Sequence, residues 1–153
     1  MKFLVCLDGS EKCKKILKEA SEIAAGCQVN DLVVLHVYEQ RLDPVSPSWG
    51  SRSHSLTEED NAFLCKLREQ EKEERKNILQ EAVKYFEENN LQARAILKEG
   101  HPAHTIVTTA VEEGTNMIVI GSRGLGGLEK IFLGSVSSAV IQEAENCIVA
   151  VVK

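Results

Sequence analysis

The sequence lacks the features of a membrane or exported protein. No apolar run approaches the roughly 20 residues that a membrane-spanning helix needs, and the run from Met1 to Leu7 is too short for the core of a signal peptide. A basic surface is also missing, because 23 acidic residues outnumber 18 basic ones and the net charge is −5. This charge argues against nonspecific binding to nucleic acid or to an anionic membrane. We therefore expect a cytoplasmic protein that binds neither.

A disulfide framework is missing as well. The five cysteines are odd in number, scattered, and contain no Cys-x-x-Cys pair. This pattern is typical of reduced thiols in a cytosol. Because most of them lie within apolar runs, we expect them to be small buried hydrophobic side chains. The hydrophobic content of 43% and the length of 153 residues suit one domain with a substantial core, so we expect a single domain over residues 1–153.

Short apolar runs alternate with stretches of helical spacing. The runs are not themselves alternating, which is typical of parallel strands covered on both faces. Strands followed by helices predict an α/β fold with a parallel sheet and right-handed crossovers. The expected strands are 3–7, 32–37, 93–97, 117–120 and 148–152, and the expected helices run from Ser10 as N-cap to Gly26, from Thr57 to about Asn90, from His101 to Gly114, and from Ser135 onward.

A glycine-rich segment follows the fourth expected strand and precedes the last helix, from Gly121 to Ser135. Glycines let a backbone approach a ligand closely, and a helix N-terminus offers free N–H groups to an anion. The segment is not a Walker loop, because Gly127 and Leu128 occupy the places of its lysine and its serine or threonine. Nor is it the dinucleotide fingerprint, because Glu129 stands where the third glycine belongs. The arrangement still predicts a phosphate-binding site.

The spacing that does fit is Gly121-x2-Gly124-x9-Gly134-Ser135, which resembles the universal stress protein family in its ATP-binding branch. Further matches occur in the family's order and cover essentially the whole chain. They are Leu7-Asp8-Gly9-Ser10, Leu35-His36-Val37, Gly100-His101-Pro102-Ala103 and the closing strand from Ile148 to Val152.

There are two departures from the family's pattern. Ile148 stands where the family often has a proline, and Asn116 where it often has an aspartate. The resemblance implies a three-layer open sandwich, Rossmann-like and of the adenine nucleotide alpha hydrolase type. Its five-stranded parallel sheet would have the strand order 3-2-1-4-5.

In such a sheet the ligand lies past the carboxyl ends of the strands at the topological switch point, here between strands 1 and 4. Asp8 and Gly121 would therefore face one crevice. We expect backbone N–H groups of Gly124, Gly134, Ser135 and Val136 to bind phosphate, with help from the hydroxyls of Ser135 and Ser137 and from Arg123.

By resemblance, Asp8 would meet the ribose or adenine side or help hold a divalent metal, and the backbone of Val37 would meet the adenine edge. The alternatives are that Asp8 only closes a turn, that Val37 belongs to the core, that Ser135 only caps its helix, and that Arg123 is an exposed loop residue.

Two other features have ordinary explanations. His101 and His104 stand three residues apart, but no third ligand is spaced to join them, so we expect surface side chains rather than a metal site. The charged stretch 68–76 is typical of a solvated helix face laced with salt bridges.

The leading hypothesis is a nucleotide-binding regulatory or stress-response module. It would bind ATP, or AMP or ADP, with Mg²⁺ or Mn²⁺. No catalytic residue is assigned, because the Walker lysine is missing and no general base is evident, so we expect no efficient hydrolysis. The alternatives are a slow ATPase or phosphotransferase, and a dimeric interaction protein with an empty pocket. We also expect a homodimer paired through the strand 147–152.

Overall fold

Five parallel strands form one sheet in the order β3-β2-β1-β4-β5, which confirms the predicted topology. The structure is a computed structural model that describes residues 1–10, 12–29, 31–39, 58–122 and 133–153. The elements in chain order are β1 (Lys2–Leu7), α1 (Cys13–Gly26), β2 (Asp31–Tyr38), α2 (Glu58–Glu88), β3 (Gln92–Glu99), α3 (Pro102–Glu112), β4 (Met117–Gly121), α4 (Ser135–Glu143) and β5 (Ile148–Val152).

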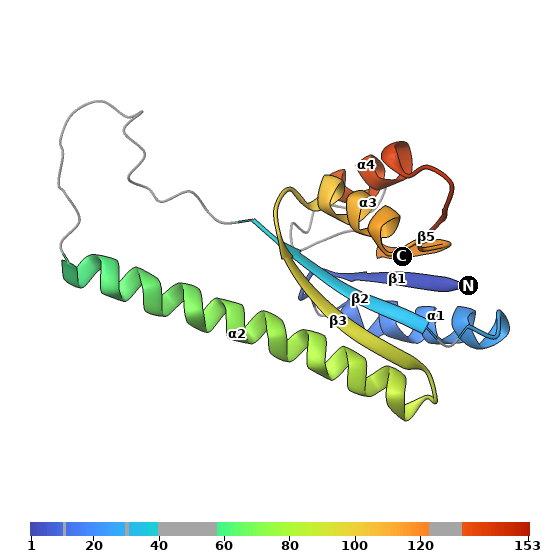
Figure 1. Cartoon of the computed structure of the whole chain (residues 1–153), viewed down its shortest axis with the longest axis horizontal. Coiled ribbons are helices and arrows are strands. Elements are labelled where there is room, and N and C mark those ends of the chain that lie inside the picture. The colour runs from blue at the N-terminus through green and yellow to red at the C-terminus, as the bar shows by residue number, and fades with distance from the viewer. Residues whose placement is uncertain (11, 30, 40–57, 123–132) are drawn as a thin grey trace.

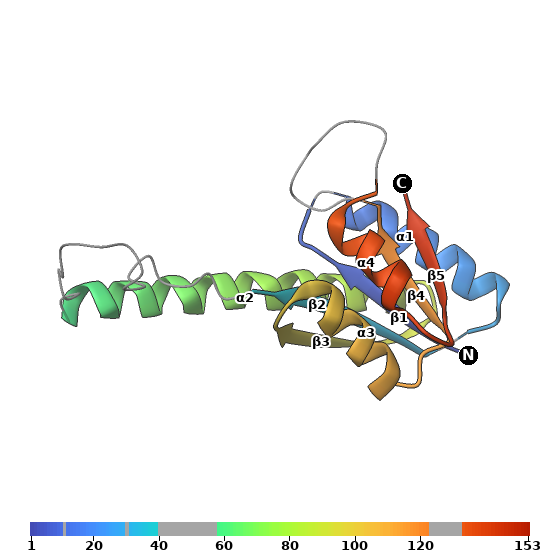
Figure 2. The same cartoon turned by 90° about the horizontal axis from the view of Figure 1, so that it is seen from above.

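Helices cover both faces of the sheet, α1 and α2 on one side and α3 and α4 on the other (Figures 1 and 2). Successive strand residues point to opposite faces, so each central strand contributes to two cores. Phe3 and Val5 of β1 pack toward α1 and α2, whereas Leu4 and Cys6 pack toward α3 and α4. The coverage of β1, β2 and β4 on both faces agrees with their largely apolar sequences.

The ends of α1 differ in detail from the prediction. The N-cap residue is Lys12, without a side-chain capping bond, so the expectation that Ser10 caps this helix was wrong. Instead the Ser10 carbonyl accepts a hydrogen bond from the Cys13 N–H at 3.0 Å. The helix does end at Gly26, but the left-handed residue after it is Gln28, at φ 54°. Ser10 is thereby left free for another role.

The apolar stripe of α3 is narrow. Ala103, Ile106 and Ala110 are buried, whereas Val111 is 70% exposed and Thr109 takes the buried place beside Ala110. Thr109 is accommodated because its hydroxyl donates to the carbonyl of Thr105. The helix stops where predicted, since Gly114 adopts φ +61°.

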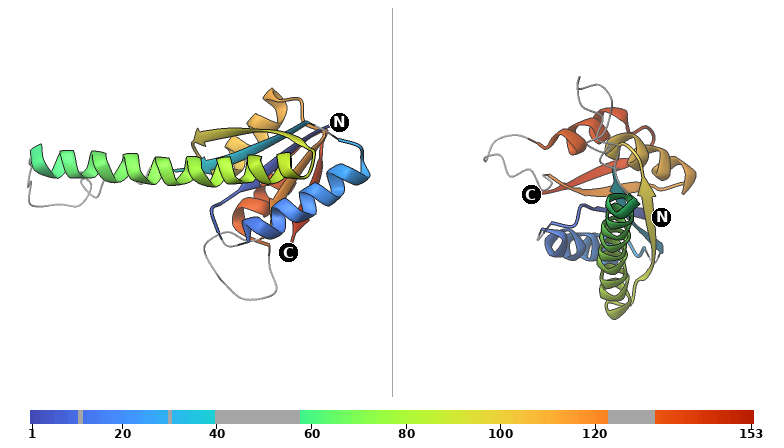
Figure 3. Two further views of the ribbon diagram at one scale, coloured as in Figure 1. Left: turned by 90° about the horizontal axis from the view of Figure 1, so that it is seen from below. Right: turned by 90° about the vertical axis from the view of Figure 1, so that its left-hand side faces the viewer.

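The helix α2 is longer than the sheet that it covers. Its C-terminal half packs through Leu79, Ala82 and Phe86, while its N-terminal half projects away from the sheet (Figures 1 and 3). On the projecting half Phe63 remains 62% exposed. The side chains of 68–76 are exposed except for Arg75, which is half-buried, and this confirms the predicted solvated face.

The cysteines are all free thiols, but they are less uniformly buried than expected. Cys6 and Cys13 are buried, whereas Cys27 and Cys65 are exposed, so the prediction that most are buried was wrong. In the part of the chain that the structure describes, no helix combines the length and the apolar character needed to cross a membrane.

Candidate functional site

The predicted crevice would lie at the carboxyl edge of the two central strands. Cys6 of β1 pairs with Ile120 of β4, so Asp8 and Ser122 leave the sheet at neighbouring points. The chain then runs in different directions, from Asp8 toward α1 on one face and from Ser122 toward α4 on the other. This is the topological switch point of the sheet, where open α/β folds bind ligands. Gly121, the last residue of β4, lies there as predicted.

The glycine-rich segment is closed at its base. The N–H of Ser122 donates to the Val152 carbonyl at 2.6 Å, and the Ser122 carbonyl accepts from the N–H of Gly134 at 2.7 Å. The backbone of Ser122 is thus anchored to β5 and to the start of α4. Arg123 and Gly124, which we expected at the phosphate, lie outside the described residues.

The N-terminus of α4 presents free donors beside this closure. Gly134 is the N-cap residue, and the first intrahelical bond runs from the Ser138 N–H to the Gly134 carbonyl at 2.9 Å. The N–H groups of Ser135, Val136 and Ser137 precede that bond and have no partner within the helix. Anions bind such helix ends through these groups and the helix dipole. Ser135 is exposed, so this donor set can be reached from solvent.

Two of the expected phosphate contacts already have partners within the protein. The Gly134 N–H donates to the Ser122 carbonyl, so a phosphate would have to displace that bond to reach it. The residue Ser137 is 2% exposed. Its hydroxyl donates to the carbonyls of Gly134 at 3.0 Å and Ser122 at 3.3 Å. Contact of Ser137 with phosphate would therefore need its hydroxyl to rotate. The N-cap residue of α4 is Gly134, so Ser135 does not take the cap position that the alternative gave it.

Asp8 closes the turn between β1 and α1. Its Oδ1 accepts from the Ser10 N–H at 3.0 Å and from the Cys13 thiol at 3.7 Å. Burial, and then the Asp8 charge, raise the pKa of Cys13, so this thiol stays protonated and acts as a donor. Gly9 between them adopts φ +78°, a conformation that favours glycine. Asp8 therefore does close a turn, as the alternative for this residue held, but it uses only one carboxylate oxygen to do so.

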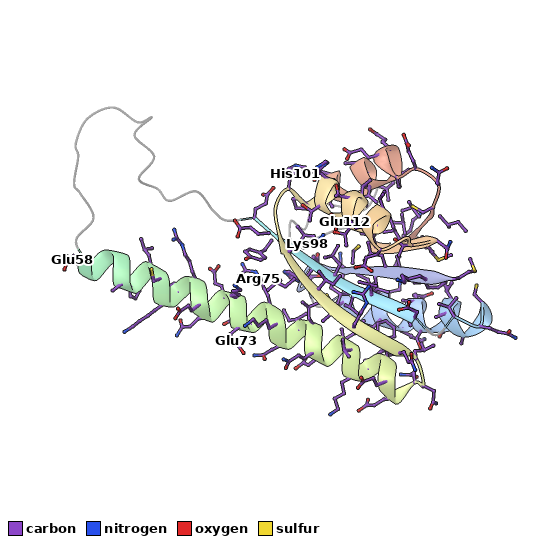
Figure 4. All side chains as sticks on the ribbon, in the orientation of Figure 1. Glu58, Glu73, Arg75, Lys98, His101 and Glu112 are labelled. Atoms are coloured by element: carbon purple, nitrogen blue, oxygen red, sulfur yellow. The ribbon has the colours of Figure 1, made fainter. Side chains whose placement is uncertain are left out.

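The neighbouring strand β2 ends beside this turn. Val37 is half-buried and packs against the core under α3. The alternative that Val37 belongs to the core is therefore partly right. Tyr38 donates to Glu99 at 3.4 Å, and the Arg75 guanidinium lies 4.9 Å from the centre of the Tyr38 ring. Arg75 also pairs with Glu71 at 3.2 Å, and it lies on α2 near the ends of β2 and β3 (Figure 4). The Val37 edge of the crevice is thus flanked by a charged cluster.

Sequence reasoning gave no role in the site to His36 or Ser122. His36 is 5% exposed, and it interrupts an otherwise apolar strand, a signal that was visible in Leu35-His36-Val37. Ser122 acts only through its backbone, which no residue pattern reports.

His101 and His104 do not take part in the crevice. Both are exposed, and His101 serves as the N-cap residue of α3 (Figure 4). Among the residues that the structure describes, no group of three His, Cys, Asp or Glu side chains is placed to hold a metal ion.

Comparison with known proteins identifies the group to which this arrangement belongs. A family model described as the universal stress protein family matches residues 1–153. Universal stress protein YxiE of Bacillus subtilis is 36% identical over 152 residues, which cover 99% of this chain and 98% of that protein. The solved structure of MJ0577, from Methanocaldococcus jannaschii, matches with a TM-score of 0.77 at 29% identity, over 99% of this chain and 94% of that one.

A further structural match is a universal stress protein from Archaeoglobus fulgidus solved in complex with dAMP. It has a TM-score of 0.65 at 24% identity and covers 100% of this chain and 98% of that one. The chain therefore belongs to the universal stress protein family.

Proposed function

We propose that this protein is an ATP-binding regulatory or stress-response module, of the ATP-binding branch of its family, whose nucleotide lies in the crevice between β1 and β4. The observation that carries the proposal is the start of α4. There the N–H groups of Ser135 and Val136, which have no partner within the helix, directly follow Gly134, whose own N–H is bonded to Ser122. A phosphate placed there would meet backbone donors and the positive end of the helix.

The remaining residues divide along the length of a nucleotide. Phosphates would lie at Gly121, Ser135 and Val136, with Ser137 orienting the helix start and with Arg123 and Gly124 assigned from the sequence pattern alone. The ribose would lie near Asp8, which directly follows β1. The adenine edge would meet the backbone of Val37. This order follows the crevice from α4 across β4 and β1 to β2.

The structural relatives support an adenine nucleotide as the ligand class. The Archaeoglobus fulgidus protein was solved with dAMP, and another universal stress protein was solved with cAMP. We choose ATP because the glycine spacing is that of the ATP-binding branch. AMP and ADP would occupy the same adenine and ribose positions.

A divalent metal would enter with the nucleotide. Asp8 directly follows β1, and holding the metal would require its Oδ1 to give up a hydrogen bond from Ser10 or Cys13. Mg²⁺ is usually held by one or two carboxylates together with substrate phosphates and water. Asp8 and the phosphates of the nucleotide would form such a set of ligands. Mg²⁺ or Mn²⁺ would neutralise phosphate charge, while the residues of α4 bind and orient the phosphates.

We propose binding without efficient hydrolysis. Phosphoryl transfer needs a positioned nucleophile and strong stabilisation of charge on the phosphates. In the described part of the crevice the donors are backbone N–H groups and hydroxyls. The buried His36 lies on the α1 and α2 side beneath the Gly9 turn, away from the start of α4.

The test of the proposed function is mass spectrometry of small molecules released from the purified protein, followed by phosphate release with added Mg-ATP. We expect an adenine nucleotide in the released fraction, and turnover far below about 1 per second. Release near 1 per second that disappears in Gly134→Val would favour the slow ATPase instead. An empty protein that binds no added nucleotide would favour the interaction protein.

Three further properties are part of the proposal. The matched residues 1–153 would form a single domain, supported by one continuous sheet. The protein would be cytoplasmic, supported by five free thiols. It would be a homodimer through 147–152, supported by the place of β5 at an edge of the sheet and by the 54% exposure of Ile148.

A further inference from the structure

Three buried polar atoms without a hydrogen-bond partner gather beneath the turn that follows β1. In the described residues these atoms are Oδ2 of Asp8, Oγ of Ser10 and Nδ1 of His36. A buried polar atom left unpaired destabilises a fold by about 1–3 kcal/mol, and such atoms are rare in native proteins. Three of them at one place indicate a shared function rather than three separate defects.

The geometry brings the three residues together. Ser10 is tied to Asp8 because its N–H donates to Oδ1 at 3.0 Å. His36 lies one strand away, where it pairs across the sheet with Leu7. Its Cε1 lies 3.5 Å from the point where a Cβ of residue 9 would stand, and Ile78 borders the same point at 3.4 Å. The imidazole therefore lies directly under the turn that holds the Asp8 carboxylate.

The charges around the ring set its protonation. Asp8 faces it from the turn and Arg75 from α2, while its sheet neighbours Leu7 and Leu97 are apolar. Burial and the Arg75 charge lower the pKa of His36, against a smaller opposing effect of Asp8. The ring is therefore neutral at pH 7, with one nitrogen as donor and the other as acceptor. Arg75 is itself held by Glu71 and by the ring of Tyr38, so its position is fixed.

We propose that His36 is a positioning residue of the nucleotide site, whose Nδ1–H is linked through one buried water, shared with the Ser10 hydroxyl, to Oδ2 of Asp8. One water can accept from Nδ1 and donate to the carboxylate and the hydroxyl, which satisfies all three atoms, and buried waters usually make about three such bonds. The link fixes the rotamer of Asp8 before the ribose arrives, so binding does not have to order that side chain.

The functional half of this inference rests on the proposed nucleotide site, whereas the link itself belongs to the ligand-free protein. His36 does not touch the nucleotide. It acts through Asp8, and for this reason the nitrogen at the Nδ1 position matters more than the size of the ring.

The link can be tested without nucleotide by nitrogen-detected NMR of the four histidines, with the His36 signals identified by their loss in His36→Asn. We expect the tautomer with the proton on Nδ1, and a changed Nδ1 shift in Asp8→Asn and in Ser10→Ala. A tautomer with the proton on Nε2 would overturn the link. So would an Nδ1 chemical shift that stays unchanged in both variants.

The positioning role is tested by three substitutions at residue 36. The amide of His36→Asn reaches the place of Nδ1, whereas that of His36→Gln reaches the place of Nε2, and His36→Leu offers no polar atom. We expect Mg-ATP affinity close to wild type in His36→Asn and a loss of about tenfold in the other two. The matched comparison of Asn with Gln separates the position of the nitrogen from general repacking.

The outcomes also separate this inference from the proposed function. Equal affinity in all three folded variants, with normal wild-type binding, would overturn the positioning role and leave the nucleotide site standing. Wild-type protein that binds no nucleotide would contradict the proposed function and the positioning role together, while the NMR experiment would still decide the link.

Discussion

The N–H of Gly134 donates to the carbonyl of Ser122 at 2.7 Å, which joins the two ends of the glycine-rich segment at its base. The same serine is bonded through its own N–H to Val152 of β5. The start of α4 is therefore fixed to two strands of the sheet, and its free N–H groups have a defined direction. We therefore expect Gly134 to hold the start of α4 in place.

Gly134→Val should spare the fold and abolish nucleotide binding. Gly134 has φ −63° and ψ 157°, which any residue can adopt, so a side chain there adds no backbone strain. It would instead crowd the approach of phosphate to Ser135 and Val136. We expect an unchanged melting temperature without ligand and at least a tenfold loss of Mg-ATP affinity by calorimetry. Leu133→Ala, at the neighbouring exposed position, is the control. Wild-type affinity in folded Gly134→Val would remove this helix start from the site.

The dimer prediction can be tested on the outer edge of β5. The Ile148 N–H and the Val152 carbonyl both bond toward β4, so by the two-residue period the backbone groups of Val151 point outward. Val151→Pro removes an outward donor without breaking a bond to β4. We expect the variant to be monomeric by light scattering at concentrations where the wild type is a dimer.

The control for the dimer is the opposite edge of the sheet. The N–H of Gly100 donates to the Tyr38 carbonyl of β2. By the same two-residue period, the backbone N–H and C=O of Ala95 in β3 point away from β2, toward the open edge. Ala95→Pro should therefore leave the dimer intact. A wild type that is monomeric at high micromolar concentration would contradict the dimer, and dissociation by both variants would contradict its assignment to β5.

Gly9→Ala should destabilise the protein by about 1–2 kcal/mol, because φ at this position is +78° and a Cβ there is strained. The matched control is Gly26→Ala, since nothing lies within 4 Å of an added Cβ and the residue ends a helix. That change should be neutral or slightly stabilising. Urea unfolding of both variants measures the difference. A stable Gly9→Ala would show that the turn relaxes at little cost.

The buried His36 predicts a dependence of stability on pH. Its pKa is lowered in the folded state from the ordinary 6.5, so the unfolded chain binds the proton more readily. The His36 contribution is therefore fully present above pH 6.5 and is lost as the pH falls from 6.5 through the lowered folded pKa. We expect the unfolding free energy of the wild type to fall relative to His36→Asn by up to about 1.4 kcal/mol per pH unit in that window. Parallel curves for the two proteins would contradict a depressed pKa.

The sequence predicted the fold better than the details of the site. Apolar runs and helical spacing located every strand and helix to within a few residues, because hydrophobic periodicity reports burial directly. Spacing alone cannot show how far α3 faces the sheet, and Val111 of this helix is 70% exposed. The sequence also assigned Ser10 to a helix cap, because serine is common both in caps and in turns.

The contacts of the site could not be read from the chain. The bond from Gly134 to Ser122 joins backbone atoms, and the neighbourhood of Asp8 and His36 depends on the pairing of β1 with β2. Residue patterns identify candidates such as Asp8 and Ser135, but the direction of an N–H group is a property of the folded backbone. For the same reason the sequence could not show that the Gly134 N–H is bonded to Ser122.

The central claim is that the crevice between β1 and β4 binds ATP, and the most direct measurement is titration calorimetry of nucleotide-free protein with Mg-ATP. The account predicts saturable binding of one nucleotide per chain, with a melting temperature that rises with ligand concentration by linkage. No heat of binding and an unmoved melting curve at millimolar Mg-ATP, in protein shown to be folded and free of ligand, would contradict it.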